Sequence, residues 1–91
     1  MVLRWTGKAL FDLERLYAFL SPVNEPAAAR VVQSLSAAPS ALLRNPRLGE
    51  RLDEFDPREV RRIFAGDYEM RYEIQDSTIY VLRVWHMREH R

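Results

Sequence analysis

The sequence lacks cysteine altogether and has only three glycines and a single lysine among its 91 residues. Without cysteine the chain can form neither a disulfide nor a thiolate site, which is typical of proteins from a reducing compartment. It also lacks an apolar run of about 18 residues and a basic leader followed by an apolar stretch, so we expect neither a membrane span nor a secretory signal. Together these absences predict a cytoplasmic protein.

An excess of one charge is missing as well. Fourteen basic residues stand against thirteen acidic ones, which leaves a net charge of +1. Because the two signs balance on either side of Pro57, any basic patch has to be built by the fold, and a large non-specific nucleic-acid footprint is not expected. The hydrophobic fraction of 47% is enough for one modest core. We therefore predict a single domain covering residues 1–91.

The clearest local signal is the pair Gly66-Asp67, which lies between two runs of alternating residues. Glycine followed by aspartate is one of the two-residue sequences that form primed hairpin turns. Such a short loop determines which residues of the two flanking strands lie opposite each other. The predicted partners are Ala65 with Tyr68, Phe64 with Glu69, Ile63 with Met70, Arg62 with Arg71, and Arg61 with Tyr72.

The second strand of this hairpin has one apolar and one polar face. Its apolar residues are Tyr68, Met70, Tyr72 and Ile74. On the polar face Arg62 would lie directly opposite Arg71, and like charges in such a pair destabilise a sheet by about a few tenths of a kcal/mol. Either Glu69 and Glu73 offset this repulsion, or the two guanidinium groups bind an anion.

Two helices are predicted before the hairpin. Thr6 is placed to cap the first helix, which ends at Ser21-Pro22. The second is expected to begin near residues 24–26, with Pro26 in its first turn. The apolar stripe of the first helix consists of Ala9, Leu13, Leu16, Tyr17 and Leu20, with Asp12, Glu14 and Arg15 outside it. The buried side of the second consists of Ala28, Val31, Val32 and Leu35.

Pro39 interrupts the helical pattern, because in a continuous helix its ring would clash with the carbonyl group of Leu35. We expect a kink or a fresh start there. Residues 47–57 show no periodicity and predict a surface loop. With a short N-terminal strand around Val2, Leu3 and Trp5, the order is strand, two helices, loop and three strands. This order predicts an α+β fold, with a helical hairpin packed on one face of a small, curved, mainly antiparallel sheet.

The last predicted strand, residues 78–85, is apolar on both faces apart from Arg83, so it belongs inside the sheet, with the N-terminal strand as a second neighbour. A two-residue turn at Asp76-Ser77 would place Arg83 opposite Met70 on the helix side, whereas a three-residue loop would place it beside Arg71 on the open face. Because an unpaired arginine under the helices would be costly, we favour the second placement. The result would be a basic group across the sheet, formed by Arg62, Arg71 and Arg83.

His86, just after this strand, is the obvious candidate for proton transfer, since imidazole titrates near neutrality. It is equally typical of a strand-end histidine bonded to the backbone. His90 lies four residues further on, a spacing that can share a metal on a helix. No third ligand accompanies the pair, so we predict neither a metal nor a cofactor.

Four segments have a recognisable pattern. They are W-T-x-x-A-x-x-D-L-x-x-L-x-x-F at Trp5–Phe19, N-x-P-A-A-A at Asn24–Ala29, N-P-R-L-G at Asn45–Gly49, and R-E-V-R-R-I-F-A-G-D-Y-x-x-R-Y-E-I…V-L-R-V-W-H-x-R-E at Arg58–Glu89. In their order and spacing they resemble the RelE/ParE superfamily of toxins from type II toxin–antitoxin modules, over nearly the whole chain. The resemblance implies two helices against a curved antiparallel sheet, and a toxin held inactive by an antitoxin that covers its exposed apolar surface with a helix or strand.

The resemblance leaves the mechanism open. RelE-like members cut messenger RNA in the ribosomal A site; in that case the catalytic set would be His86, Arg62 and Arg83. ParE-like members instead poison DNA gyrase and have no catalytic residues. The target-binding residues predicted for either mechanism are Arg61, Arg62, Arg71, Arg83 and Arg88.

Two features favour the ParE branch. Many RelE-like nucleases carry a tyrosine near the C-terminus, and here no tyrosine follows Tyr80. The V-x-H-x-R sequence that begins at Val84 also resembles ParE-like chains. A third alternative is a non-toxic domain that only binds an antitoxin.

Overall fold

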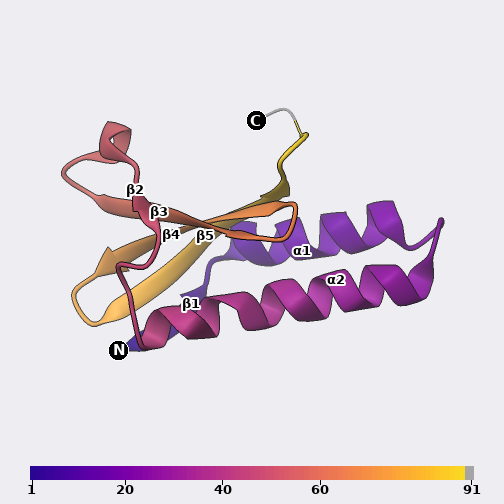
Figure 1. Ribbon diagram of the computed structural model, residues 1–91, viewed down its shortest axis with the longest axis horizontal. Coiled ribbons are helices and arrows are strands. Elements are labelled where there is room, and N and C mark those ends of the chain that lie inside the picture. The colour runs from indigo at the N-terminus through magenta and orange to yellow at the C-terminus, as the bar shows by residue number, and fades with distance from the viewer. Residues whose placement is uncertain (90–91) are drawn as a thin grey trace.

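The computed structural model describes residues 1–89. Two helices lie side by side on one face of an open five-stranded sheet (Figure 1). The strands are β1 (Val2–Trp5), β2 (Glu50–Arg51), β3 (Glu59–Ala65), β4 (Tyr68–Gln75) and β5 (Thr78–His86), and the helices are α1 (Gly7–Leu20) and α2 (Glu25–Ala37). The predicted α+β architecture is confirmed. Among the described residues no helix is long and apolar enough to cross a membrane.

The strand order is β1-β5-β4-β3-β2, with β1 parallel to β5 and all other neighbours antiparallel. The hairpin register predicted from Gly66-Asp67 is confirmed at every pair, from Ala65 opposite Tyr68 to Arg61 opposite Tyr72. Gly66 has a φ of +59°, a backbone conformation that glycine adopts without steric cost.

Both predicted helix starts are confirmed by their caps. The Thr6 hydroxyl accepts a hydrogen bond from the Ala9 amide at 3.2 Å, and the Asn24 side chain accepts one from Ala27 at 3.1 Å. The chain also starts afresh near Pro39, because α2 ends at Ala37 and a 3₁₀ helix, η1 (Ala38–Leu43), follows.

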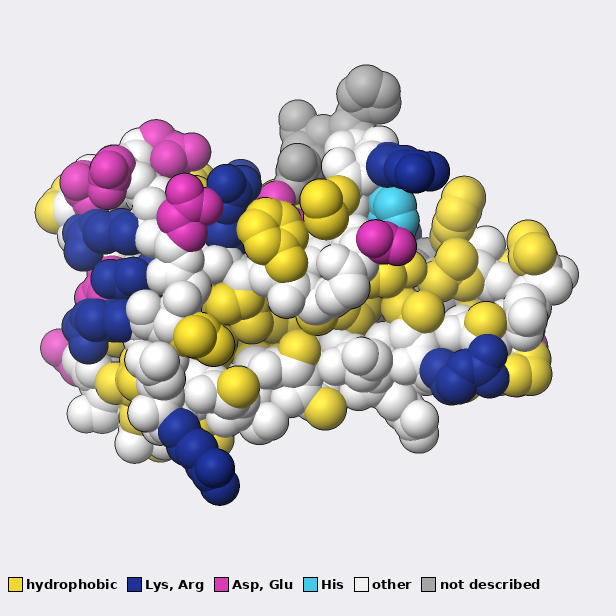
Figure 2. All heavy atoms as spheres, viewed as in Figure 1, with side chains coloured by type: hydrophobic (Ala, Val, Ile, Leu, Met, Phe, Trp, Pro, Cys, Tyr) yellow, Lys and Arg dark blue, Asp and Glu magenta, His cyan; other side chains and the backbone are white. Residues whose placement is uncertain are grey.

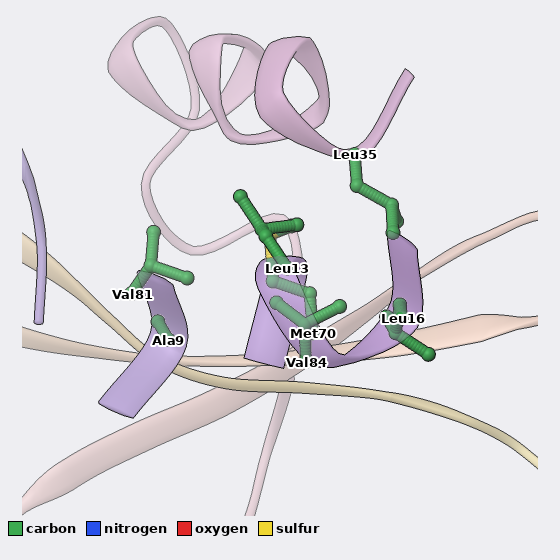
Figure 3. Close-up of a cluster of buried hydrophobic side chains, with 7 residues drawn as sticks. All are labelled: Ala9, Leu13, Leu16, Leu35, Met70, Val81 and Val84. Carbon is green, nitrogen blue, oxygen red and sulfur yellow. The ribbon is translucent and has the colours of Figure 1, made fainter. Parts of the chain in front are cut away.

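The core lies between the helices and the sheet. Its largest cluster joins three residues of α1 and one of α2 to the apolar faces of β4 and β5 (Figure 3): Ala9, Leu13, Leu16, Leu35, Met70, Val81 and Val84. Tyr72 and Ile74 form a second cluster with Leu42 and Ile79. The predicted stripes extend less far than expected, since Tyr17 is exposed and Val31 and Val32 are only half-buried.

Arg83 lies opposite Arg71, as predicted, but for a different reason. The turn at Asp76-Ser77 has only two residues, which alone would place Arg83 opposite Met70. An irregularity between Arg71 and Tyr72 leaves Leu82 as an extra residue in β5 and shifts every later side chain to the other face. The β-bulge in β5 therefore places Arg83 on the same face of the sheet as Arg71.

Two further expectations were wrong. Residues 47–57 are not only a loop, because they contain β2, which pairs with Arg61 and Arg62 of β3, and a second 3₁₀ helix, η2 (Asp53–Phe55). Asp12 does not lie outside the buried stripe of α1, since only 1% of it is exposed.

Candidate functional site

The three arginines of the predicted basic group form a row across the sheet. Arg62, Arg71 and Arg83 are register partners on β3, β4 and β5, on the face opposite the helices. That face is not open as expected, because the carboxylates of Glu69 and Glu73 are almost completely buried there. A row of cations is therefore interleaved with buried anions.

Arg71, in the middle of the row, is enclosed by aromatic rings. Its guanidinium carbon lies 5.5 Å from the ring centre of Phe55 and 4.9 Å from that of Trp85. Its Nε also donates to Glu69 at 3.2 Å. Cation–π contacts and an ion pair thus stabilise this arginine within the protein.

The two outer arginines also have carboxylate partners. Arg62 donates to Glu50 across the β2–β3 pair at 2.8 Å and lies 3.8 Å from Glu69. Arg83 makes a bidentate contact with Asp12, at 2.8 and 3.1 Å, which raises its pKa. Of the two carboxylates predicted to offset the arginines, Glu69 does so, whereas Glu73 pairs with Arg58 at 2.7 Å.

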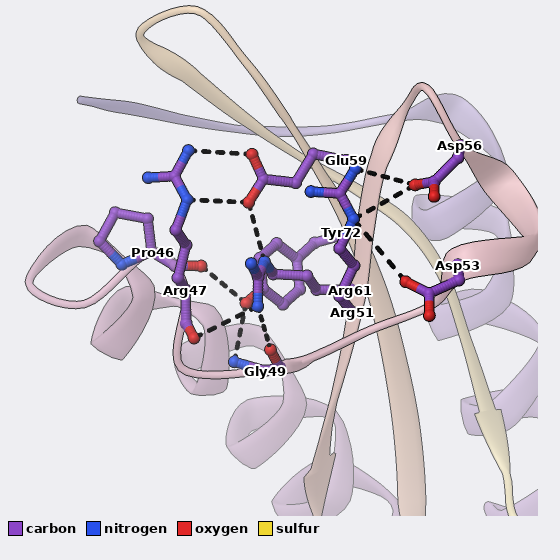
Figure 4. Close-up of polar contacts among 9 residues, drawn as sticks. All are labelled: Pro46, Arg47, Gly49, Arg51, Asp53, Asp56, Glu59, Arg61 and Tyr72. Carbon is purple, nitrogen blue, oxygen red and sulfur yellow. Dashed lines mark hydrogen bonds and ion pairs between the residues drawn. The ribbon is translucent and has the colours of Figure 1, made fainter.

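Arg61 does not join this row. Adjacent residues of a strand point to opposite faces, and Arg61 shares its face with Tyr72, next to Pro46, Arg47 and Gly49 (Figure 4). It donates to the carbonyl of Gly49 at 2.8 Å and to Glu59 at 2.9 Å. Arg61 therefore fastens the 45–49 segment to the sheet.

Tyr72 also holds the 45–49 segment against the sheet. Its hydroxyl donates to the carbonyl of Pro46 at 2.7 Å and accepts from the amide of Gly49 at 3.0 Å. Burial raises the pKa of this phenol. Because it is buried and has both hydrogen bonds satisfied, Tyr72 has a structural role.

His86 is engaged through its ring nitrogen Nδ1, which accepts the amide of Arg88 at 3.1 Å. Its ring meets Tyr68 edge to face, with ring centres 5.2 Å apart. The backbone amide therefore occupies the acceptor position of Nδ1. His90, four residues further on, lies outside the described residues.

Arg88 differs from the other predicted target-binding residues. It is exposed, and within residues 1–89 no ion pair is recorded for it. Next to it, Met87 is 49% exposed. The predicted set is therefore split into a paired row (Arg62, Arg71 and Arg83), a structural residue (Arg61) and an exposed cation (Arg88).

A long apolar depression runs between α2 and the β3–β4 hairpin, and Figure 2 shows hydrophobic side chains gathered along it. It has a volume of about 410 Å³ and is lined by five apolar residues, Ala27, Val31, Leu35, Ala65 and Tyr68, together with Arg30, Ser34, Gly66 and Asp67. We call it the helix–hairpin groove. An apolar groove of this kind is typical of a protein-binding surface.

Next to that groove, the outer edge of β3 is only partly covered. Strand β2 pairs with Arg61 and Arg62 and reaches no further. Within the described residues, Ile63 to Ala65 therefore have no strand on this side, and Phe64 is 52% exposed. We call residues 63–65 the open edge.

Sequence reasoning missed Asp12 and Glu50 as partners of the arginines. A signal for Asp12 was present, because Ala9 lies three residues before it and Leu16 four residues after it, both in the apolar stripe. At helical spacing this places Asp12 on the border of the buried face. No comparable signal marks Glu50, which depends on the pairing of β2 with β3.

Comparisons with known proteins agree with this fold. A chain from the chromosomal ParDE toxin–antitoxin system of P. aeruginosa is 24% identical, with a TM-score of 0.79 over 94% of this chain and 95% of that one. A chain from the RelBE2 toxin–antitoxin complex of Mycobacterium tuberculosis is 29% identical, with a TM-score of 0.57 over 93% of this chain and 88% of that one. No curated protein sequence matches the chain.

The family model described as the ParE toxin of the type II toxin–antitoxin system parDE matches residues 3–91. This span includes both helices, all the strands after β1 and the arginine row. The chain belongs to the ParE family of type II toxins.

Proposed function

We propose that this toxin arrests growth by poisoning DNA gyrase and that a cognate antitoxin neutralises it. The observation that carries the proposal is that the residues an RNA-cleaving site would need already have partners within the protein. Arg62 is paired with Glu50, and Arg83 with the buried carboxylate of Asp12. A phosphate bound here would have to compete with the carboxylates that already neutralise both guanidinium groups.

The contacts of His86 also argue against an RNA-cleaving site. RNA cleavage needs a base for the 2′-hydroxyl group and an acid for the leaving oxygen. His86 accepts a backbone hydrogen bond at Nδ1 and lies against Tyr68. It is better placed to shape the end of β5 than to transfer protons.

The test for the gyrase proposal uses purified toxin, DNA gyrase and supercoiled plasmid. We expect linear DNA to accumulate with the toxin and to disappear when the antitoxin is added first. No linear product at toxin concentrations well above that of gyrase would contradict the proposal. Harmless expression of the toxin without antitoxin would instead support the non-toxic alternative.

An RNA-cleaving function remains a second candidate, because the chain is also similar to one from the RelBE2 complex. The variant His86→Asn separates the two. Asparagine keeps an acceptor near the position of Nδ1 but cannot transfer protons. We expect His86→Asn to arrest growth as the wild type does, whereas loss of toxicity with a stably folded variant would favour the nuclease.

For the antitoxin, the helix–hairpin groove and the open edge together provide the contact surface. An apolar helix face fits the groove, and an extended segment can pair with residues 63–65. Co-expression with the gene encoded next to the toxin should raise the yield of soluble toxin and give a complex on gel filtration. No complex would contradict this assignment of partner.

A further inference from the structure

The second half of β5 has no strand on its outer side within the described residues. Strand β1 pairs with β5 only as far as Trp5 opposite Val81, after which the chain turns into α1. Side chains of α1 take the place of the missing strand. The Val84 amide donates to Asp12 at 2.8 Å, and the Val84 carbonyl accepts from Arg15 at 3.2 Å.

Glu89 folds back onto the same place. One of its carboxylate oxygens accepts the His86 amide at 2.8 Å, and the other forms an ion pair with Arg15. Its own amide donates to the His86 carbonyl at 2.9 Å. Glu89 thus closes a tight turn after β5 and ties it to α1.

These contacts join into one chain of alternating charge. Arg83 is bidentate to Asp12, Arg15 lies 3.5 Å from the same carboxylate, and Arg15 pairs with Glu89. Asp12 is buried, while Arg15 and Glu89 are about one-third exposed. We call the four residues Arg83, Asp12, Arg15 and Glu89 the latch.

The turn that the latch closes carries Met87 and Arg88. On its other side the Met87 amide donates to the carbonyl of Asp67 in the β3–β4 turn, at 2.9 Å. The Arg88 amide is held by His86. The result is an exposed tip, one apolar side chain beside one cation, whose backbone is fixed from both sides.

We propose that the latch is a positioning device that holds the Met87–Arg88 tip in the shape needed to contact the toxin's target. Asp12, Arg15 and Glu89 act through this tip and do not touch the target themselves. The tip fits an acidic protein surface with an apolar pocket beside it. The inference rests on the proposed function in so far as that target is gyrase.

The experiment compares Glu89→Ala with Glu14→Ala in the purified full-length toxin. Both remove a glutamate, but Glu14 is exposed on α1 and makes no ion pair recorded in residues 1–89. For Glu89→Ala we expect amide hydrogen exchange at His86 and Met87 to rise about tenfold, the effect of one charge-assisted hydrogen bond. We also expect the toxin concentration for half-maximal gyrase cleavage to rise about tenfold. Antitoxin affinity should change less than gyrase cleavage, because Glu89 does not itself line the helix–hairpin groove.

Glu89→Gln provides a graded variant. It keeps an acceptor for the His86 amide but loses the charge opposite Arg15, so both readouts should fall between those of the wild type and Glu89→Ala. If Glu89→Ala cleaves as efficiently as Glu14→Ala, or if exchange at the tip does not rise, the proposal is overturned.

The wild type shows separately whether the gyrase proposal holds. If it traps no gyrase but arrests growth, only the gyrase target is lost, and growth arrest by the same variants decides the role of the latch. If the wild type is harmless, the latch has no target to serve and its proposed role is overturned as well.

Discussion

The unpaired parts of β5 and β3 differ in whether their backbone groups have hydrogen-bond partners. At the β5 side, Asp12 and Arg15 of α1 satisfy the backbone of Val84. At the β3 side, the two-residue strand β2 leaves the open edge at residues 63–65 uncovered. A sheet edge whose backbone groups have partners cannot accept another strand, whereas an open one can. The structure therefore leaves residues 63–65 available to a partner strand, whereas side chains of α1 occupy the backbone of Val84.

The difference also separates two uses of charge. On the closed side an aspartate is buried beneath a helix and used twice, by Arg83 and by the Val84 amide. On the open side, Glu50 pairs with Arg62 at the surface, where its carboxylate is exposed. A buried pair is costly to break, while an exposed pair contributes little. Four predictions test this contrast, beginning with the largest expected effect.

Removing the buried carboxylate should weaken the closed side most. Asp12→Ala leaves the buried Val84 amide and the partly exposed Arg83 without their partner, and an unsatisfied buried donor together with the lost charge-assisted hydrogen bonds costs about 3 kcal/mol. Urea denaturation should show a loss of this size in the free energy of unfolding. A loss as small as that of Glu14→Ala would mean that Asp12 does not close the edge.

Gly49→Ala should disturb the 45–49 segment, which leads into β2. A methyl group here would lie 2.5 Å from the Arg62 carbonyl oxygen and 2.8 Å from the Tyr72 hydroxyl. Overpacking of this kind costs about 1–3 kcal/mol. The matched control is Gly7→Ala, where a methyl group meets nothing within 4 Å. Equal stability of the two variants in thermal unfolding would contradict the prediction.

Acid should remove part of the stability of the polar face. Hydrogen bonds from Arg58 lower the pKa of the buried Glu73 carboxyl, so the folded state binds a proton less readily than the unfolded chain. The stabilisation is therefore complete above the ordinary glutamate pKa of about 4.3 and is lost as pH falls through the lowered value. Arg58→Ala should be less stable than the wild type at neutral pH, by less than Gly49→Ala. The difference should shrink in acid; a constant difference from pH 7 to pH 3 would contradict this origin.

At the open edge we expect almost no effect on stability but a clear effect on binding. Phe64→Lys exchanges an exposed ring for a charge, and such surface changes stay within about 0.5 kcal/mol. A lysine on an edge strand opposes the addition of another strand, so antitoxin affinity should fall. Titration calorimetry measures this. Unchanged affinity would show that the antitoxin does not use this edge.

The sequence alone was sufficient wherever the interaction is local. Thr6 and Asn24 cap their helices through residues three positions away, and Gly66-Asp67 sets the register of the strands that it joins. Motif order was enough to place the chain in its superfamily. These features depend on short stretches of chain, whose geometry follows from backbone sterics and hydrogen bonding.

The candidate site depended on contacts between distant segments. Arg83 contacts Asp12, which lies 71 positions earlier in the sequence. The face of the sheet on which Arg83 lies is set by a β-bulge that the turn residues do not predict. Glu50 reaches Arg62 only because β2 forms. Local pattern therefore determined both main helices, the four longer strands and their order, and the resemblance of the motifs indicated the superfamily. Only the tertiary structure decided which of the predicted target-binding arginines are neutralised and that Arg88 among them stays exposed, because the partner of a charge depends on how remote segments pack.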